Sequence, residues 1–196
     1  MLKNIKKHFN EIPLVIKKFA VKCLIMFVVW ESLYHLVMIP LNQPDKWLTH
    51  STAIVTAKVL SIIKADGPYT VIDVFDKQTG IDADNAPVFK SVVLLNNRKI
   101  IGIANACNAL ELMVLYVGFL FCLPTTYKRA IVFSICGLIA IFALNIVRCA
   151  LIAWINLNGH HQLADMAHHY LFKLAMYLLI FAAWVWYSKK IQIEKS

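Results

Sequence analysis

Four apolar stretches run through this chain, and each approaches or exceeds the length needed to cross a bilayer. They cover roughly residues 19–39, 104–123, 130–157 and 168–187. A transmembrane helix needs about 20 mostly apolar residues, and a hydrophobic share of 60% is too high for an ordinary soluble domain. The sequence therefore predicts an all-α integral membrane bundle of about four transmembrane helices.

Lysine and arginine are distributed unevenly around these stretches. They gather in residues 1–18, at Lys128 and Arg129, and in residues 189–196. The positive-inside rule places all three positions in the cytoplasm, so residues 1–18 and 189–196 are predicted to be basic cytoplasmic ends. This orientation explains the net charge of +9. We therefore expect the lipid bilayer, and no nucleic acid, as the partner of the basic residues.

Residues 40–103, between the first two predicted spans, are the most polar part of the chain and are predicted to lie outside the cytoplasm. Within them, residues 47–63 carry apolar side chains at helical spacing, which predicts an amphipathic helix that lies on the outer interface or crosses the membrane. Three segments rich in valine, isoleucine and aromatic residues follow: 69–75, 89–95 and 99–103. Asn96 and Asn97 separate the last two and favour a tight turn. We expect a small α/β insertion whose β-hairpin leads directly into the second span.

Cys107 lies where this insertion enters the second span, in the run G-I-A-N-A-C-N-A-L-E-L. A thiol at that point is accessible from water and held by a rigid element, as a nucleophile must be. Most single cysteines are packing residues, so a catalytic role depends on which groups come near it.

Two other polar groups are predicted to reach the same depth on the same side of the membrane. Arg148 lies 18 residues after the start of the third span, which is roughly 27 Å along a helix and near the outer face of a bilayer about 30 Å thick. It is the only Asp, Glu, Lys or Arg between residues 130 and 164, and a charge inside a span is a functional hypothesis by default. His168 and His169 open the fourth span, also at the outer face.

These three kinds of group form a coherent chemistry. A thiolate attacks carbonyl carbons and is favoured by cationic neighbours. A histidine can protonate a leaving amine, and an arginine can stabilise a developing oxyanion.

Two other interpretations remain open. The chain is a non-enzymatic membrane assembly subunit if its polar outer residues are structural. Alternatively, a His-rich membrane site for a metal or haem would use two histidine pairs eight residues apart, at 160–161 and 168–169. No cysteine or carboxylate motif of metalloprotease type accompanies the histidines, so we predict no metal and no other cofactor.

The order of these residues resembles the exosortase/archaeosortase family of membrane transpeptidases. That family has a Cys at the outer start of one helix, an N-x-x-R on the next and a His opening the one after. The matching residues here are Cys107, Asn145 with Arg148 in N-I-V-R, and His168 or His169 in M-A-H-H-Y-L-F-K. The resemblance covers about residues 88–188. The short chain and the H-H-Y-L-F-K run are most similar to the compact XrtF-like exosortases of the Bacteroidetes.

Two motifs depart from the family. Where the family commonly has Cys-Ser-Gly, this chain has Cys107-Asn108-Ala109. Where Gly-Trp often follows the histidine, this chain has Phe172-Lys173.

The resemblance implies a cysteine transpeptidase that cleaves C-terminal sorting signals of secreted proteins through a thioester. Such a signal consists of a short motif, a transmembrane helix and a basic tail. Residues 104–188 would be a three-helix catalytic core, with Cys107 as nucleophile and Arg148 stabilising the oxyanion or thiolate. The resemblance also implies a multi-pass protein of the bacterial inner membrane whose active site faces the periplasm.

The choice between the two histidines follows from helical geometry. Successive residues of a regular helix are about 100° apart, so only one of the two rings can face Cys107. We predict His169 as the acid/base, because Lys173 and Met176 share its helix face and a lysine is an unusual residue to turn toward lipid. His168 is the alternative, with Asp165 one turn before it as a partner. Asn145, Asn108 and Asp165 are predicted supporting residues.

Overall fold

The computed structural model describes residues 13–41, 43–63, 66–77 and 87–189. Most of the two predicted basic ends therefore lies outside the described residues. The helices and strands follow one another in this order: α2 (Leu14–Leu33), the π-helical turn η1 (Tyr34–Met38), α3 (Ile39–Leu41), α4 (Asp45–Ile63), β1 (Tyr69–Lys77), β2 (Pro87–Leu95), β3 (Arg98–Ala104), the 3₁₀ turn η2 (Asn105–Cys107), α5 (Leu110–Cys122), α6 (Tyr127–Leu157), α7 (His161–Met166), the π-helical turn η3 (Ala167–Leu171) and α8 (Phe172–Lys189).

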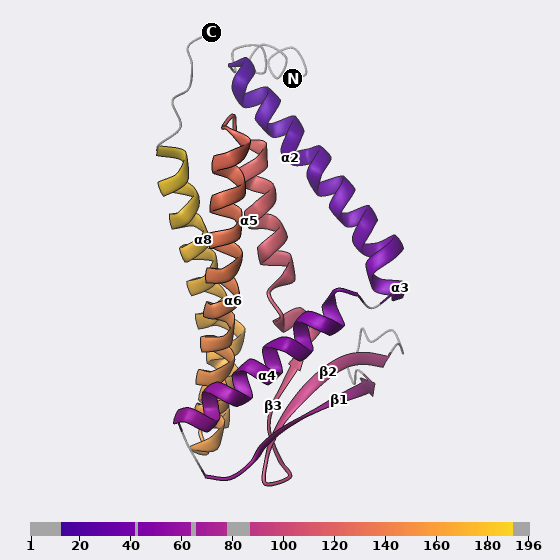
Figure 1. Ribbon diagram of the computed structural model, residues 1–196, viewed down its shortest axis with the longest axis vertical. Helices are drawn as coiled ribbons and strands as arrows, with labels where there is room; N and C mark the ends of the chain where they lie inside the picture. Colours follow the sequence, from indigo (N-terminus) through magenta and orange to yellow (C-terminus); the bar gives the residue numbers. More distant parts are fainter. Residues whose placement is uncertain (1–12, 42, 64–65, 78–86, 190–196) are drawn as a thin grey trace, which may run out of the picture.

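The molecule has a helical bundle at one end and a mixed layer at the other (Figure 1). Helices α5, α6 and α8 run side by side, and α2 leans away from them. Helix α4 crosses beneath α5, with the three strands on its far side, at the end opposite to the start of α2 and the end of α8. Helix α4 and the three strands, between α2 and α5, thus form a layer of their own, and the sheet has one strand more than the predicted hairpin.

Two of the described helical segments are long and apolar enough to cross a membrane by length and composition. They are Ile16–Leu41, with 26 residues and a mean hydropathy of 1.8, and Tyr127–Leu157, with 31 residues and a mean hydropathy of 2.6. Helix α5 is apolar but has only 13 residues, which is about 20 Å of helix. The number of four spans stays a prediction.

Glycines let the helices of the bundle approach closely. A Cβ at Gly118 of α5 would overlap the side chain of Met26 on α2, and one at Gly137 of α6 would overlap the ring of Tyr116 on α5. Small residues at such contacts are typical of helices packed in membranes. The Tyr116 hydroxyl also donates a hydrogen bond to the carbonyl of Phe133 at 3.1 Å, so α5 and α6 are fixed by both packing and a polar contact.

The three strands form an antiparallel sheet in the order β1-β2-β3. Asn96 and Asn97, between β2 and β3, have φ angles of 49° and 64°, which confirms the tight turn predicted from this pair. Val93 pairs with Ile101, and an irregularity in the register between Val93 and Leu94 leaves Ile100 as an extra residue on β3. Strand β3 ends at Ala104, three residues before Cys107.

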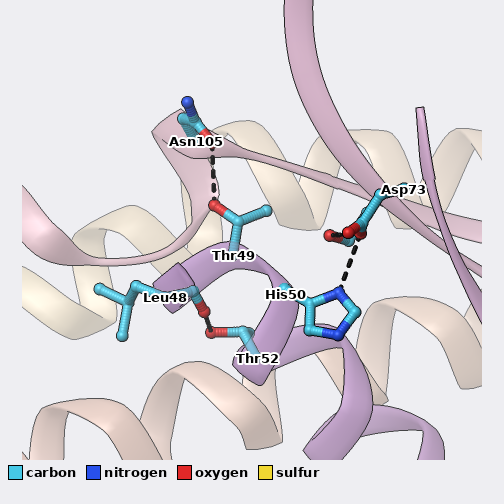
Figure 2. A network of polar contacts seen from close by, with 7 residues as sticks. Leu48, Thr49, His50, Thr52, Asp73 and Asn105 are labelled. Atoms are coloured by element: carbon cyan, nitrogen blue, oxygen red, sulfur yellow. Dashed lines mark hydrogen bonds and ion pairs between the residues drawn. The ribbon is translucent and has the colours of Figure 1, made fainter. Parts of the chain in front are cut away.

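Helix α4 packs against the sheet and against α6. Its buried face consists of small and mid-sized side chains, namely Leu48, Thr49, Thr52, Ala53, Thr56, Ala57 and Leu60. The Thr52 hydroxyl donates to the carbonyl of Leu48 at 2.8 Å, and His50 contacts Asp73 of β1 at 2.9 Å (Figure 2). Because one face of α4 is covered by protein, this helix is part of the fold and not a free amphipathic segment.

Candidate active site

Cys107 lies in a loop between strand β3 and helix α5, and not on a helix. Residues Asn105–Cys107 form a 3₁₀ turn, and α5 begins only at Leu110. The predicted second span starts about six residues earlier than the helix itself. The cysteine is half-buried, so a turn pinned between a strand and a helix presents the thiol.

Ala109 explains one of the departures from the family pattern. It has a φ of 66°, in the left-handed region, and is 7% exposed. This conformation costs an L-residue with a Cβ roughly 1–2 kcal/mol, whereas glycine adopts it freely. The turn therefore has the backbone geometry that suits the glycine of Cys-Ser-Gly, and alanine occupies it here at a steric cost.

Asn108 holds the loop from the side of α4. Its Oδ1 accepts a hydrogen bond from the backbone N–H of Leu110 at 2.8 Å, which satisfies a free donor at the start of α5. Its Nδ2 donates to Asp45 Oδ1 at 2.6 Å and to Thr49 Oγ1 at 3.3 Å. The Thr49 hydroxyl donates in turn to Asn105 Oδ1 at 3.0 Å (Figure 2). Both ends of the turn that carries Cys107 are thus tied to α4.

The sequence did not indicate Asp45 and Thr49 as site residues. Asp45 is 4% exposed and Thr49 is fully buried. An aspartate after a proline at the start of a helix is an ordinary helix-start signal, and its burial against Asn108 comes from a contact 63 residues away. No local pattern reveals such a contact.

Asn145 and Arg148 hold the loop from the side of α6. The Asn145 side chain donates from Nδ2 to the backbone carbonyl of Cys107 at 2.9 Å, and its Oδ1 faces Arg148 Nη1 at 3.4 Å. Residues three apart share a helix face, so the N-x-x-R spacing places the amide and the guanidinium on the same side of α6. Both side chains are buried, with exposures of 0% and 7%.

His168 joins the thiol to the guanidinium. Its Nε2 lies 3.7 Å from Cys107 Sγ, and its Nδ1 lies 3.2 Å from Arg148 Nη2. The structure therefore brings together a cysteine, an arginine and a histidine from the β3–α5 loop, α6 and η3.

The arginine fixes which nitrogen of this ring carries the proton. A guanidinium has only donors, so His168 Nδ1 must accept at the 3.2 Å contact. The neutral ring then carries its proton on Nε2, which faces the sulfur at 3.7 Å. The contact is therefore a donor aimed at Cys107 Sγ.

The choice between the two histidines depended on which residues share a helix face. The π-helical turn η3 changes that alignment. In a turn of this kind residues five apart fall on one face, so His168 aligns with Lys173, where a regular helix would align His169. Lys173 and Met176 do line a cavity together with Arg148. The side chain of His169 lies outside what the structure describes, and its catalytic role stays a prediction.

Two cavities border the site. One of about 280 Å³ is lined by Cys107, His168, Asp165 and strand β3. The other, of about 210 Å³, is lined by Arg148, Asp45, Glu111 and Lys173, among others. Within the described part of the chain, the buried Nε of Arg148 has no hydrogen-bond partner. The guanidinium thus has a donor left for a further acceptor.

Among the residues that the structure describes, no group of three or more His, Cys, Asp or Glu side chains is placed to hold a metal ion. Asp165, a predicted supporting residue, lies in the cavity beside His168. The supporting role of Asp165 stays a prediction.

Comparison with known proteins identifies the family of the chain. A family model described as transmembrane exosortase (Exosortase_EpsH) matches residues 16–186. No curated protein and no solved structure matches the chain. The family match covers the apolar helices, the α/β insertion and every residue of the site, well beyond the half of the chain that carries the N-x-x-R and histidine motifs. The chain is a membrane protein that belongs to the transmembrane exosortase family.

Proposed function

We propose that the protein is a cysteine transpeptidase that cleaves the C-terminal sorting signals of secreted proteins through a thioester. The observation that carries this proposal is a closed ring of contacts: Cys107 Sγ to His168, His168 to Arg148, Arg148 to Asn145, and Asn145 back to the Cys107 carbonyl. A thiol held on both its side chain and its backbone, beside a donor and a cation, is arranged for nucleophilic attack.

The first chemical step follows from the roles of these groups. The Cys107 thiolate attacks the scissile carbonyl carbon, and the oxyanion that forms accepts hydrogen bonds from Arg148. His168 protonates the amine as the C–N bond breaks, which leaves a thioester on Cys107 and releases the transmembrane helix and basic tail of the substrate. An external nucleophile then releases the secreted protein from the thioester.

Arg148 has to move for His168 to act as an acid. The imidazole must carry two protons to donate one, and Nδ1 cannot carry a proton while it accepts from Arg148 Nη2. In the proposed cycle the guanidinium leaves Nδ1 for the substrate oxygen, and Nδ1 takes up, through water, the proton that the Cys107 thiol gives up when it forms the attacking thiolate. Because its Nε2 faces Cys107 Sγ, we assign the acid/base role to His168, in place of His169.

We further propose the compact XrtF-like subtype of the Bacteroidetes, and a bacterial inner-membrane protein with four spans and its site on the periplasmic side. Lys128, Arg129 and Lys189 support this orientation by the positive-inside rule. Reporter fusions at Pro124 and Ser196 should read cytoplasmic, and a fusion at Asp84 should read periplasmic. An external signal at Ser196 would contradict the four-span topology.

The test of this function does not require a known substrate. Membrane proteins are compared by mass spectrometry in cells that carry the wild type, Cys107→Ala or Cys136→Ala. Cys136 is an exposed cysteine of α6 and serves as the matched control. We expect a set of secreted precursors to keep their C-terminal span and basic tail only in the Cys107→Ala cells. Identical precursor sets in all three strains would favour a non-enzymatic assembly subunit.

A further inference from the structure

Strand β3 is an edge strand that points at the nucleophile. In the sheet order β1-β2-β3, β3 pairs with β2 and forms one edge. It ends at Ala104, three residues before Cys107. An edge strand presents a row of backbone donors and acceptors that an added peptide can pair with.

The edge of β3 forms one wall of the cavity that contains the thiol. Residues 99–103 line this cavity of about 280 Å³, with Cys107 and His168 on the same cavity. Asn156 of α6, which lines the same cavity, donates from Nδ2 to the carbonyl of Ile100 at 3.3 Å. This backbone acceptor of β3 therefore takes its hydrogen bond from a side chain that is not part of the sheet.

Gly102 leaves space on the same wall. It is exposed, and a Cβ built there would meet only the flexible end of Lys99 at 3.4 Å and a methyl group of Val92 at 4.0 Å. A glycine inside a strand often marks a place where another backbone comes close. Lys99 and Asp165 put one charge of each sign on this cavity, so its polar groups suit a peptide better than a lipid chain.

We propose that the extended segment of the substrate that precedes its transmembrane helix binds along β3 as a fourth strand, and that this pairing delivers the scissile bond to Cys107. This inference rests on the proposed function. The partner is a peptide in extended conformation. Its backbone would provide most of the binding, and contacts of its side chains with the cavity would provide specificity.

The direction of the added strand follows from the placement of the sheet. Chain direction in β3 runs from the Asn96–Asn97 turn toward Cys107 and the bundle (Figure 1). A secreted substrate enters from outside and continues into its transmembrane helix, so it runs the same way, and the pairing is parallel. Ala104 comes five residues after Lys99, which is roughly 17 Å of strand. The substrate residue beside Lys99 is therefore roughly five to eight residues before the scissile bond.

The experiment uses a precursor that accumulates in Cys107→Ala cells. A photo-crosslinking benzoylphenylalanine replaces Lys99 on β3 or, as the matched control, Ile72 on β1, the other edge of the sheet, whose side chain is 45% exposed. Both probes are placed in full-length Cys107→Ala protein in membranes. We expect the Lys99 probe, and not the Ile72 probe, to capture the precursor on the N-terminal side of its cleavage point.

A proline scan of the same precursor segment tests backbone pairing. In a strand only alternate residues point their N–H at the neighbour, and proline removes that donor. We expect proline at every second position of this segment to lower the rate of cleavage by the wild-type protein. Alanine at the same positions should have a smaller effect that does not alternate along the segment.

The outcomes separate the two proposals. If precursors accumulate in Cys107→Ala cells but the Lys99 probe captures nothing, captures a second copy of this chain, or captures the segment C-terminal to the cleavage point, the parallel-strand proposal is wrong and the function stands. The same holds if the proline scan shows no period of two. If no precursor accumulates at all, the proposed function itself fails.

Discussion

The loop that carries Cys107 is held from two sides, and the two sides differ in how complete their contacts are. On the anchor side, formed by Asp45, Thr49 and Asn108, the hydrogen bonds that Asn108 Nδ2 donates to the side chains of α4 run from 2.6 to 3.3 Å. On the reactive side, formed by Asn145, Arg148 and His168, contacts are longer, at 3.2 to 3.7 Å apart from the Asn145 bond to the backbone. The reactive side also has a buried guanidinium nitrogen with no partner among the described residues.

This difference suggests a division of labour between two layers of the fold. The insertion positions the backbone of the loop, because its contacts join short side chains that have few alternative rotamers. In the proposed reaction the bundle supplies the groups that change partners, namely a long arginine and a titratable imidazole. Changes on the reactive side should therefore abolish the chemistry, and changes on the anchor side should mainly loosen the loop.

The largest effect is expected from the histidine of the reactive side. His168→Ala removes the ring that contacts both Cys107 and Arg148, and loss of a general acid costs on the order of 10²–10⁴ in rate. His169→Ala is the matched control and should process the precursor at nearly the wild-type rate. Pulse-chase processing at equal protein levels measures both. Loss of processing in His169→Ala alone would return the acid/base role to His169.

Arg148 should be nearly as sensitive, and lysine should not replace it. Two different nitrogens of the guanidinium contact His168 and Asn145, and a lysine ammonium cannot reproduce this planar fork. We expect Arg148→Lys and Arg148→Ala each to lose about 10²–10³ in processing rate, the usual cost of an oxyanion donor. Near-normal processing by Arg148→Lys at an unchanged protein level would mean that the positive charge alone matters.

Asp45→Ala tests the anchor side. It leaves the buried Nδ2 of Asn108 without its shortest partner, and loss of a hydrogen bond to a charged group costs about 1.5–3 kcal/mol in the free energy of unfolding. Lys58→Ala, at an exposed position of the same helix, is the control. Thermal unfolding in detergent measures stability, and thiol labelling measures the exposure of Cys107. We expect a lower Tm and faster labelling at Cys107. An unchanged labelling rate would show that α4 does not position the loop.

The comparison of the two sides also shows which parts of the site are readable from sequence. Cys107 and Arg148 are predictable because an isolated thiol at a span boundary and an isolated charge within a span stand out against apolar neighbours. The Asn96–Asn97 turn is predictable because few residues accept a positive φ. These are local signals, and each depends on residue type at a single position.

The rest depends on geometry that no local pattern encodes. The π-helical turn at Ala167–Leu171 shifts the helix phase and brings His168 to the thiol, whereas the 3.6-residue period favoured His169. The burial of Asp45 depends on α4 crossing the β3–α5 loop, a contact between residues 63 apart in the chain. The left-handed Ala109 is hidden in the sequence because alanine gives no sign of a positive φ.

The smallest expected effect concerns how α4 is fixed to the sheet, and therefore how firmly the anchor side is held. Asp73 of β1 accepts a hydrogen bond from Ser91 at 2.7 Å and contacts His50 of α4 at 2.9 Å. Burial raises the pKa of Asp73, but the hydrogen bonds from Ser91 and His50 outweigh it and lower this pKa below its ordinary value of 3.8. A carboxyl whose pKa is lower in the folded state adds stability at pH values above its unfolded pKa and loses that contribution as the pH falls through the folded pKa.

Wild type should accordingly lose more stability than Asp73→Asn when the pH is lowered from about 5 to about 3. The difference should be small, within about 1 kcal/mol, because His50 and Asp73 are partly exposed, at 41% and 32%, and water screens such pairs. Thermal unfolding of both proteins in detergent across this pH range measures it, with Ser91→Ala giving an intermediate slope. If the curves of wild type and Asp73→Asn run parallel, the contact with His50 does not hold α4 to the sheet, and the anchor side depends on Asp45, Thr49 and Asn108 alone.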